Sequence, residues 1–98
     1  MPPLAVGFHP QAVAEATAAA EWCRQRNEGA GAAFVAELDR AIESIAGAPG
    51  RWPRYLHGTR RFLLHRFPFS VVYQEAPGGI EVVAVVHGRR RPGYWKDR

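Results

Sequence analysis

The stretch that decides the fold is Ile80-Glu81-Val82-Val83-Ala84-Val85-Val86, which runs into His87-Gly88-Arg89-Arg90-Arg91. It is rich in β-branched side chains and apolar on both faces after its start. This pattern is typical of a central strand covered on one side and partly shielded on the other. Alternation with period 2 places on one face the residues Val83, Val85, His87 and Arg89. The stretch therefore predicts a strand over Ile80–His87 that ends in a basic cluster.

Two further strands are predicted before this one. Phe69–Glu75 is joined to it by Ala76-Pro77-Gly78-Gly79, a hairpin signal. Arg61–Phe67 forms another strand-like run, and Pro68 after it fits a strand end better than a strand centre. The C-terminal half therefore predicts a three-stranded meander.

The N-terminal half predicts a short strand and two helices. Leu4–Phe8 is an apolar run, and Pro10 after it suits the first turn of a helix. Gln11–Asn27 is Ala-rich and free of internal Gly or Pro, with Trp22 beside an apolar stripe at helical spacing, formed by Val13, Ala16, Ala20 and Cys23. This segment predicts the first helix.

A break at Gly29-Ala30-Gly31 separates this helix from a second one. Gly47 closes the second helix as a C-cap. Its predicted buried face consists of Phe34, Leu38, Ala41, Ile42 and Ile45. Its other side carries Glu37, Asp39, Arg40 and Glu43. So short a break favours an antiparallel helical hairpin.

The segment Ala48–Thr59 holds two Pro and two Gly residues, and it predicts a loop from the helices to the sheet. Trp52 and Tyr55 are expected to anchor it, and Tyr73 is expected in the core. With 98 residues, the chain is expected to form one domain over residues 1–98, in the order strand, helix, helix and three strands.

Charge is divided unevenly along the chain. Residues 1–50 hold three cations and six acids, a net −3, whereas residues 51–98 hold ten cations and three acids, a net +7. Twelve of the thirteen cations are Arg, whose planar fork pairs bidentately with phosphate or carboxylate. The basic half therefore favours contact with a polyanion or an acidic protein over mere solubility, although GC-rich coding also enriches Arg.

Several functional classes are not supported by the sequence. No apolar stretch approaches the roughly 20 residues of a membrane span, so we expect a cytoplasmic protein that does not enter a membrane. The single cysteine, Cys23, suits a reducing compartment and helix packing. No phosphate-binding loop, metal-ligand spacing or hydrolase motif is present, and we expect neither a metal nor another cofactor.

The basic half nevertheless holds the residue types that RNA cleavage requires. His87 or His65 can exchange protons near neutral pH, and Tyr94 or Trp95 can stack on a base, Tyr94 also serving as a proton donor. Phosphate can be held by Arg60, Arg66, Arg89 and Arg91. The same types occur on many basic surfaces, so a packing role for His87 and a solvated tail for the Arg run stay open.

Three segments, Phe8-His9-Pro10 with Ala12, Arg61–Tyr73 and Val83–Trp95, make the chain similar to the RelE/ParE superfamily of toxins, often labelled plasmid-stabilisation proteins. The resemblance spans nearly the whole length. It implies an α+β fold with a helical hairpin packed on a small, mainly antiparallel sheet. It also implies neutralisation by a cognate antitoxin, whose acidic, disordered segment would suit the basic half of this chain.

The resemblance leaves the target open, because one branch cleaves mRNA on the ribosome and another poisons DNA gyrase by protein contact. Arg61–Tyr73 is more similar to the ParE-like side. If the chain is a metal-independent endoribonuclease, the positional candidates for catalysis are His87, Arg66, Arg89 and Tyr94. The candidates for contact with target or antitoxin are Arg60, Arg61, His65, Arg90, Arg91 and Trp95. The rival hypothesis is that the chain is a degenerate, non-toxic module that only binds its partner. A third hypothesis is a general nucleic-acid-binding domain.

Overall fold

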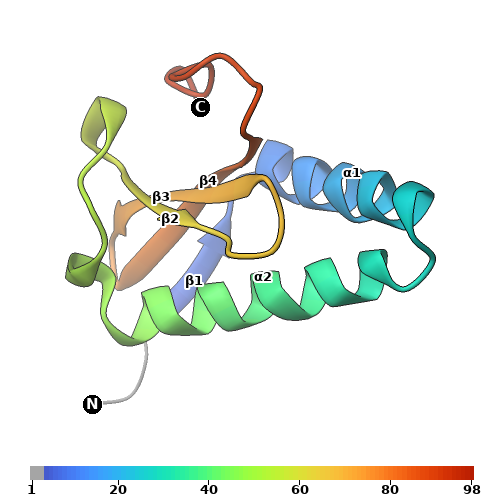
Figure 1. The fold of residues 1–98 in the computed structure, drawn as a ribbon. Helices are drawn as coiled ribbons and strands as arrows, with labels where there is room; N and C mark the ends of the chain where they lie inside the picture. Colours follow the sequence, from blue (N-terminus) through green and yellow to red (C-terminus); the bar gives the residue numbers. More distant parts are fainter. Residues whose placement is uncertain (1–3) are drawn as a thin grey trace.

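The computed structural model describes residues 4–98 and confirms the predicted α+β order of elements (Figure 1). These elements are β1 (Ala5–Phe8), α1 (Pro10–Arg26), α2 (Ala30–Gly47), β2 (Arg60–Leu63), β3 (Phe69–Ala76) and β4 (Gly79–His87). The sheet has the order β1-β4-β3-β2, in which β1 is parallel to β4 and the other neighbours are antiparallel. The stretch that decides the fold is thus a central strand, as predicted.

α1 and α2 pack against each other as the predicted antiparallel hairpin. Pro10 occupies the first turn of α1, and Nδ1 of His9 accepts the N–H of Gln11 as an N-cap. The break before α2 is shorter than predicted, because Ala30 and Gly31 already belong to α2. Gly31 lies so close to α1 that a Cβ there would come within 3.0 Å of the Ala20 carbonyl oxygen. A glycine that was expected to break a helix instead allows two helices to approach.

The main core lies between the helical hairpin and one face of the sheet. α2 contributes the predicted residues Phe34, Leu38, Ala41 and Ile45, with Ile42 partly buried beside them. Tyr73, predicted to be a core residue, is 1% exposed in the same cluster. The predicted stripe of α1 is wrong at Val13, which is exposed. The buried residues of α1 are Ala12, Ala19 and Cys23, and Ala16 and Ala20 pack against them.

A β-bulge in β4 changes which residues share a face. Val72 of β3 pairs with Ala84, but the next residue, Tyr73, pairs with Val82, so Val83 has no partner of its own. Val82 and Val85 therefore both face the helices, whereas Val83 joins the cluster on the opposite face. The prediction that Val83 and Val85 share a face is wrong, because strict alternation cannot anticipate an inserted residue.

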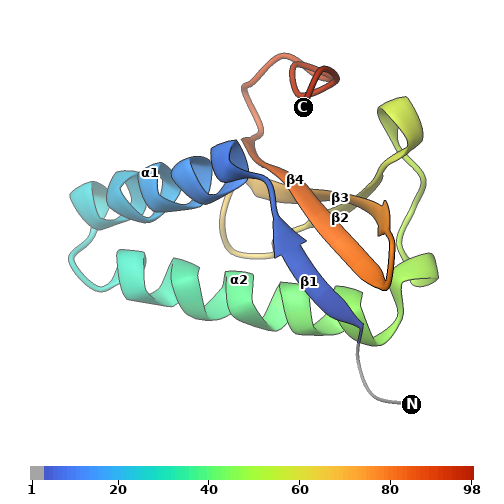
Figure 2. The same ribbon diagram turned by 180° about the vertical axis from the view of Figure 1, so that it is seen from behind.

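The opposite face of the sheet is covered by the connection before β2 and by the C-terminal segment, neither of which is a helix of the hairpin or a strand of the sheet. Val72, Ala84 and Val86 are buried there under Trp95, with Tyr55 and Tyr94 packed against the cluster. Figures 1 and 2 show that the sheet lies between α2 and the C-terminal segment. This segment follows β4 and folds back over the sheet. It places the last residues of the chain beside β4 and α1.

The connection from α2 to the sheet is anchored as predicted. Trp52 packs edge-on against Phe62 with ring centroids 4.5 Å apart, and Tyr55 stacks on Trp95 at 5.5 Å. β2 ends at Leu63 and not at the predicted Phe67, because the chain turns away after it. Among residues 4–98, neither helix is long and apolar enough to span a membrane.

Candidate functional site

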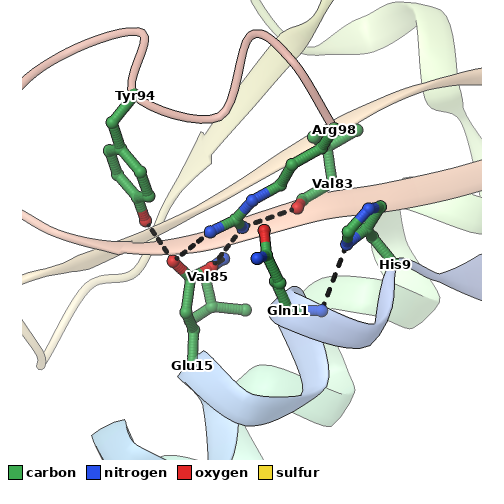
Figure 3. Close-up of polar contacts among 7 residues, drawn as sticks. All are labelled: His9, Gln11, Glu15, Val83, Val85, Tyr94 and Arg98. Carbon is green, nitrogen blue, oxygen red and sulfur yellow. Dashed lines mark hydrogen bonds and ion pairs between the residues drawn. The ribbon is translucent and has the colours of Figure 1, made fainter.

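Two side chains hydrogen-bond to backbone groups on the edge of β4 that β1 does not reach. β1 pairs with β4 only from Gly79 to Val82, so the edge of β4 on the β1 side has no neighbouring strand beyond Val82, whereas β3 pairs along the other edge as far as His87. The carboxylate of Glu15 on α1 accepts the N–H of Val85 at 3.1 Å, and the guanidinium of Arg98 donates to the carbonyl of Val83 at 3.0 Å (Figure 3). Two side chains thus satisfy backbone groups that a fifth strand would otherwise satisfy.

The same two side chains bind each other and capture Tyr94. Arg98 donates to both carboxylate oxygens of Glu15, at 2.8 and 3.0 Å, and the hydroxyl of Tyr94 donates to Glu15 at 2.5 Å (Figure 3). The side chains of Arg98 and Glu15 are only 12% and 15% exposed. We call Glu15, Tyr94 and Arg98 the C-terminal clamp, because they hold the C-terminal segment on α1 and β4.

The clamp shifts the pKa values of its members in opposite directions. Burial alone would raise the pKa of the Glu15 carboxyl, but hydrogen bonds from Arg98, Tyr94 and the Val85 N–H outweigh it and hold the pKa below its ordinary value. Burial raises the pKa of Tyr94 well above its ordinary value, and the hydrogen bond to the Glu15 carboxylate raises it further. Glu15 therefore stays ionised, and Tyr94 retains its proton.

His87 lies at the end of β4 in aromatic surroundings. Its ring packs edge-on against Trp22, with centroids 5.2 Å apart, and against Phe69 at 5.0 Å. Its Nδ1 accepts the N–H of Arg89 at 3.0 Å, so a neutral imidazole carries its proton on Nε2. His87 and Arg89 lie close together, as expected. The contact is made by the backbone N–H of Arg89, and the Arg89 side chain is exposed.

His65 and Arg66 lie at the same end of the sheet as His87, in the turn between β2 and β3. Glu37 of α2 holds this turn, accepting the N–H of His65 at 2.7 Å, the N–H of Arg66 at 3.2 Å and Nε of Arg66 at 3.3 Å. The N–H of Gly88 donates to Pro68, which joins the turn to the residue after β4. The topology thus brings His65, Arg66 and His87 to one end.

Glu37 is buried, which differs from the prediction for the polar side of α2. The helical pattern placed it on the polar side, yet it is 8% exposed, because the turn after β2 folds over it. Burial alone would raise the pKa of the Glu37 carboxyl, but the two backbone N–H groups and Arg66 lower it below its ordinary value. Helical spacing showed only what α2 buries against the sheet, so it missed a carboxylate that is buried by a loop.

Arg60 and Arg61 lie at the other end of β2, opposite Tyr73 and Val72. Arg60 donates to the Trp52 carbonyl at 2.6 Å, and the Arg61 guanidinium lies 4.2 Å from the centroid of the Tyr55 ring. Tyr73 donates its hydroxyl to Pro49, and burial raises its pKa to about 12. The structure therefore does not gather all the predicted cations into one site.

Trp95 and Tyr94 do not occupy the positions that a base-stacking platform requires. Trp95 is 2% exposed and packs on the sheet, so its ring is not presented at the surface in this structure. Tyr94 is half-buried, and its hydroxyl is engaged by Glu15. Arg89, Arg90 and Arg91, by contrast, are exposed, and the guanidinium of Arg90 lies 3.9 Å from the centroid of the Tyr94 ring.

The sequence missed Glu15, Glu37 and Arg98 as organising residues. Each lies far along the chain from its partners, and the only sequence signal is the presence of acids in helices beside a basic C-terminal half. Within residues 4–98, no three His, Cys, Asp or Glu side chains come together as metal ligands.

Comparison with known proteins places this arrangement in a family. A model of the ParE toxin of type II toxin-antitoxin systems, parDE, matches residues 6–92. The chain belongs to the ParE toxin family. The match covers every strand and helix of the ParE-family chain except the first residue of β1, and it ends within the C-terminal segment, before Tyr94 and Arg98.

A solved structure described as a chromosomal ParDE TA system from P. aeruginosa has the same fold as this ParE-family chain, with a TM-score of 0.74. The sequences are 17% identical, and the similarity covers 86% of this chain and 95% of that one. No curated protein matches this sequence. The expected similarity to the RelE/ParE superfamily, on the ParE-like side, is confirmed.

Proposed function

We propose that this ParE-family toxin inhibits growth by binding DNA gyrase, and that a cognate antitoxin neutralises it. The observation that carries the first part is the C-terminal clamp. Tyr94, the candidate proton donor for RNA cleavage, donates its hydroxyl to a buried carboxylate that also binds Arg98. A phenol with a raised pKa in such a contact would have to leave it to protonate a leaving oxygen.

The remaining cleavage candidates support the same choice. Nδ1 of His87 is occupied by a backbone N–H, and two aromatic rings pack against the ring. Arg66 pairs with Glu37, and Trp95, a candidate base platform, is buried. A surface that acts by protein contact needs none of these groups free, whereas the exposed Arg89, Arg90 and Arg91 are available to an acidic protein surface.

The second candidate is ribosome-dependent cleavage of mRNA without a metal ion. It is favoured because four residues lie at one end of the sheet: His65, Arg66, His87 and Arg89. Among the described residues, Nε2 of His87 has no hydrogen-bond partner. In that reading Nε2–H of His87 donates a proton to the leaving oxygen, His65 is the proton acceptor, and the arginines stabilise charge on the phosphorane.

Expression of the gene by itself in a bacterium tests toxicity. We expect growth to stop, and to resume when the protein encoded by the neighbouring reading frame is produced as well. With the purified chain, we expect inhibition of gyrase supercoiling and no new cuts in mRNA translated by ribosomes. Cuts that vanish in His87→Ala or Tyr94→Phe, with gyrase unaffected, would establish the second candidate. Unimpaired growth with folded protein accumulating would leave a non-toxic binding module.

A further inference from the structure

A hollow of about 430 Å³ lies where the connection from α2 meets the start of β2 and the end of β3. Figures 1 and 2 show this connection at the end of the sheet away from α1. The hollow is therefore separate from the cleavage candidates at the end of β4, and its lining is mainly polar. We call it the β2 hollow. The lining residues that decide its chemistry are Arg54, Tyr55, Arg60, Tyr73 and Glu75.

Two arginines lie opposite each other at the β2 hollow. Arg54 and Arg60 form an isolated antiparallel bridge beside β2. The backbone hydrogen bonds on either side of this bridge, at 2.8 and 3.1 Å, join the neighbours of the two arginines and not the arginines themselves. In an antiparallel pair of this kind the Cα atoms are only about 4.5 Å apart, and both side chains leave the same face. The fold therefore brings two positive side chains together.

The charge of this arginine pair is not neutralised within the described chain. Over residues 4–98, neither Arg54 nor Arg60 takes part in an ion pair. Glu75 also lines the hollow, but it lies two residues beyond Tyr73, the partner of Arg60 in β3, so it is opposite neither arginine. Like charges directly opposite each other destabilise a sheet. An anion between the two guanidinium groups would remove this repulsion.

The guanidinium of Arg60 is held in place and has hydrogen-bond donors to spare. Its Nη1 donates to the Trp52 carbonyl at 2.6 Å, and its other N–H groups have no partner among the described residues. Burial raises the pKa of Tyr73, and the positive charge of Arg60 offsets part of that rise, so this charge lies near the Tyr73 hydroxyl. The planar fork of a guanidinium matches the oxygens of a phosphate. Arg60 is thus a preorganised donor at the hollow.

The aromatic residues of the lining do not offer a platform for a nucleic-acid base. The ring of Tyr55 already stacks on Trp95 at 5.5 Å and lies 4.2 Å from the Arg61 guanidinium. Tyr73 is 1% exposed. A single-stranded nucleic acid needs a free aromatic face, and an apolar peptide segment needs an apolar lining. The β2 hollow therefore favours a small, hydrophilic anion.

We propose that the β2 hollow binds the phosphate group of a small ligand between the guanidinium groups of Arg54 and Arg60. Such a group supplies the negative charge that the arginine pair lacks and acceptors for its N–H groups. It can be inorganic phosphate or the monoester of a polyol, whose hydroxyl groups can donate to the Glu75 carboxylate. The site goes beyond the proposed function, and its test requires neither gyrase nor the antitoxin.

Heteronuclear NMR titration of the full chain tests the site, with inorganic phosphate, glycerol phosphate and glycerol as probes at constant ionic strength. We expect saturable shifts at the amides of Arg54 and Arg60 with the two phosphates and none with glycerol. Arg54→Gln should raise Kd for both phosphates about tenfold or more, because it removes a charge-assisted contact. Arg51→Gln is the matched control, since Arg51 is exposed in the same connection and does not line the hollow. No saturable shift with either phosphate, or equal affinity of Arg54→Gln and wild type, would overturn the proposal.

Glu75→Gln distinguishes the two sources of the phosphate group. Tighter binding of glycerol phosphate than of inorganic phosphate, with the preference lost in Glu75→Gln, would assign the hollow to a phosphorylated polyol. Equal affinities would assign it to inorganic phosphate. Inorganic phosphate should bind Glu75→Gln at least as tightly as wild type, because a negative charge has left the hollow. A loss of affinity for inorganic phosphate in this variant would overturn the placement of the anion.

Thermal unfolding at low salt, without any phosphate, tests the repulsion itself. Arg54→Gln should melt about 2 °C higher than Arg51→Gln, because it removes one of two like charges that lie opposite each other. Added sodium chloride should shrink the difference by screening the two charges. A lower melting temperature for Arg54→Gln would show that the arginines do not repel each other, and would overturn the basis of the site.

Discussion

Arg98 binds Glu15 through both oxygens of its carboxylate, at 2.8 and 3.0 Å, across 83 residues of sequence. The pair does more than join two charges, because each partner also binds the open backbone edge of β4, at Val85 or Val83. A helix, a central strand and the C-terminal segment are thereby held together by two side chains. The stability of the basic surface consequently depends on an acid in the other half of the chain.

Glu15→Ala is expected to lower the free energy of unfolding by about 3 kcal/mol, since it leaves Arg98, the Tyr94 hydroxyl and the Val85 N–H without their shared acceptor. Urea denaturation followed by tryptophan fluorescence measures this. Glu43→Ala is the matched control, because Glu43 is an exposed acid on α2. A loss no larger than that of the control would show that the C-terminal clamp does not stabilise the fold.

Glu37→Gln is expected to speed amide hydrogen exchange at His65 and Arg66, because a neutral amide is a weaker acceptor than the carboxylate that binds both N–H groups. Residue-resolved exchange measured by NMR detects the change. Asp39→Asn, which neutralises an exposed acid two positions away, should leave these amides unchanged. Equal protection in wild type and Glu37→Gln would mean that the turn after β2 is held by other contacts.

Acid is expected to destabilise the protein through Glu15 and Glu37. Both carboxyls have pKa values below their ordinary value of 4.5 in the folded state, so their contribution to stability is complete above that value. It is lost as pH falls through the lower, folded pKa values, because protonation then removes the charge that the contacts require. Urea denaturation between about pH 7 and pH 3 measures the slope. Glu15→Gln and Glu37→Gln should each flatten it, and unchanged slopes would contradict the assignment.

Gly79→Ala is expected to cost about 3 kcal/mol or more of unfolding free energy, because a Cβ at this position would overlap the backbone carbonyl of Ala5. Relief would require separating β1 from β4 where their pairing begins. Gly50→Ala is the matched control, since a Cβ there meets no atom within 4 Å. Thermal unfolding compares the two variants, and similar melting temperatures would show that β1 shifts freely.

Much of the fold was predictable because it depends on local pattern. The β-branched run of β4 and the apolar spacing of α2 each describe one element against a single buried surface, so sequence periodicity located them. The site was less predictable. The position of His87 at the end of a strand was predicted, but the hydrogen-bond partner of Tyr94 could not be, since Glu15 lies 79 residues away on a helix.

The sequence by itself determined the order of elements, the central place of β4 and the basic character of its end, because spacing and composition act over neighbouring residues. Only the tertiary structure decided that Val83 bulges, that Glu37 is buried by a turn, and that Glu15 binds Tyr94 and Arg98. Each of these arises where a backbone group or a charge loses water and must find a partner. Which partner is within reach depends on how distant segments pack, and no local pattern records that.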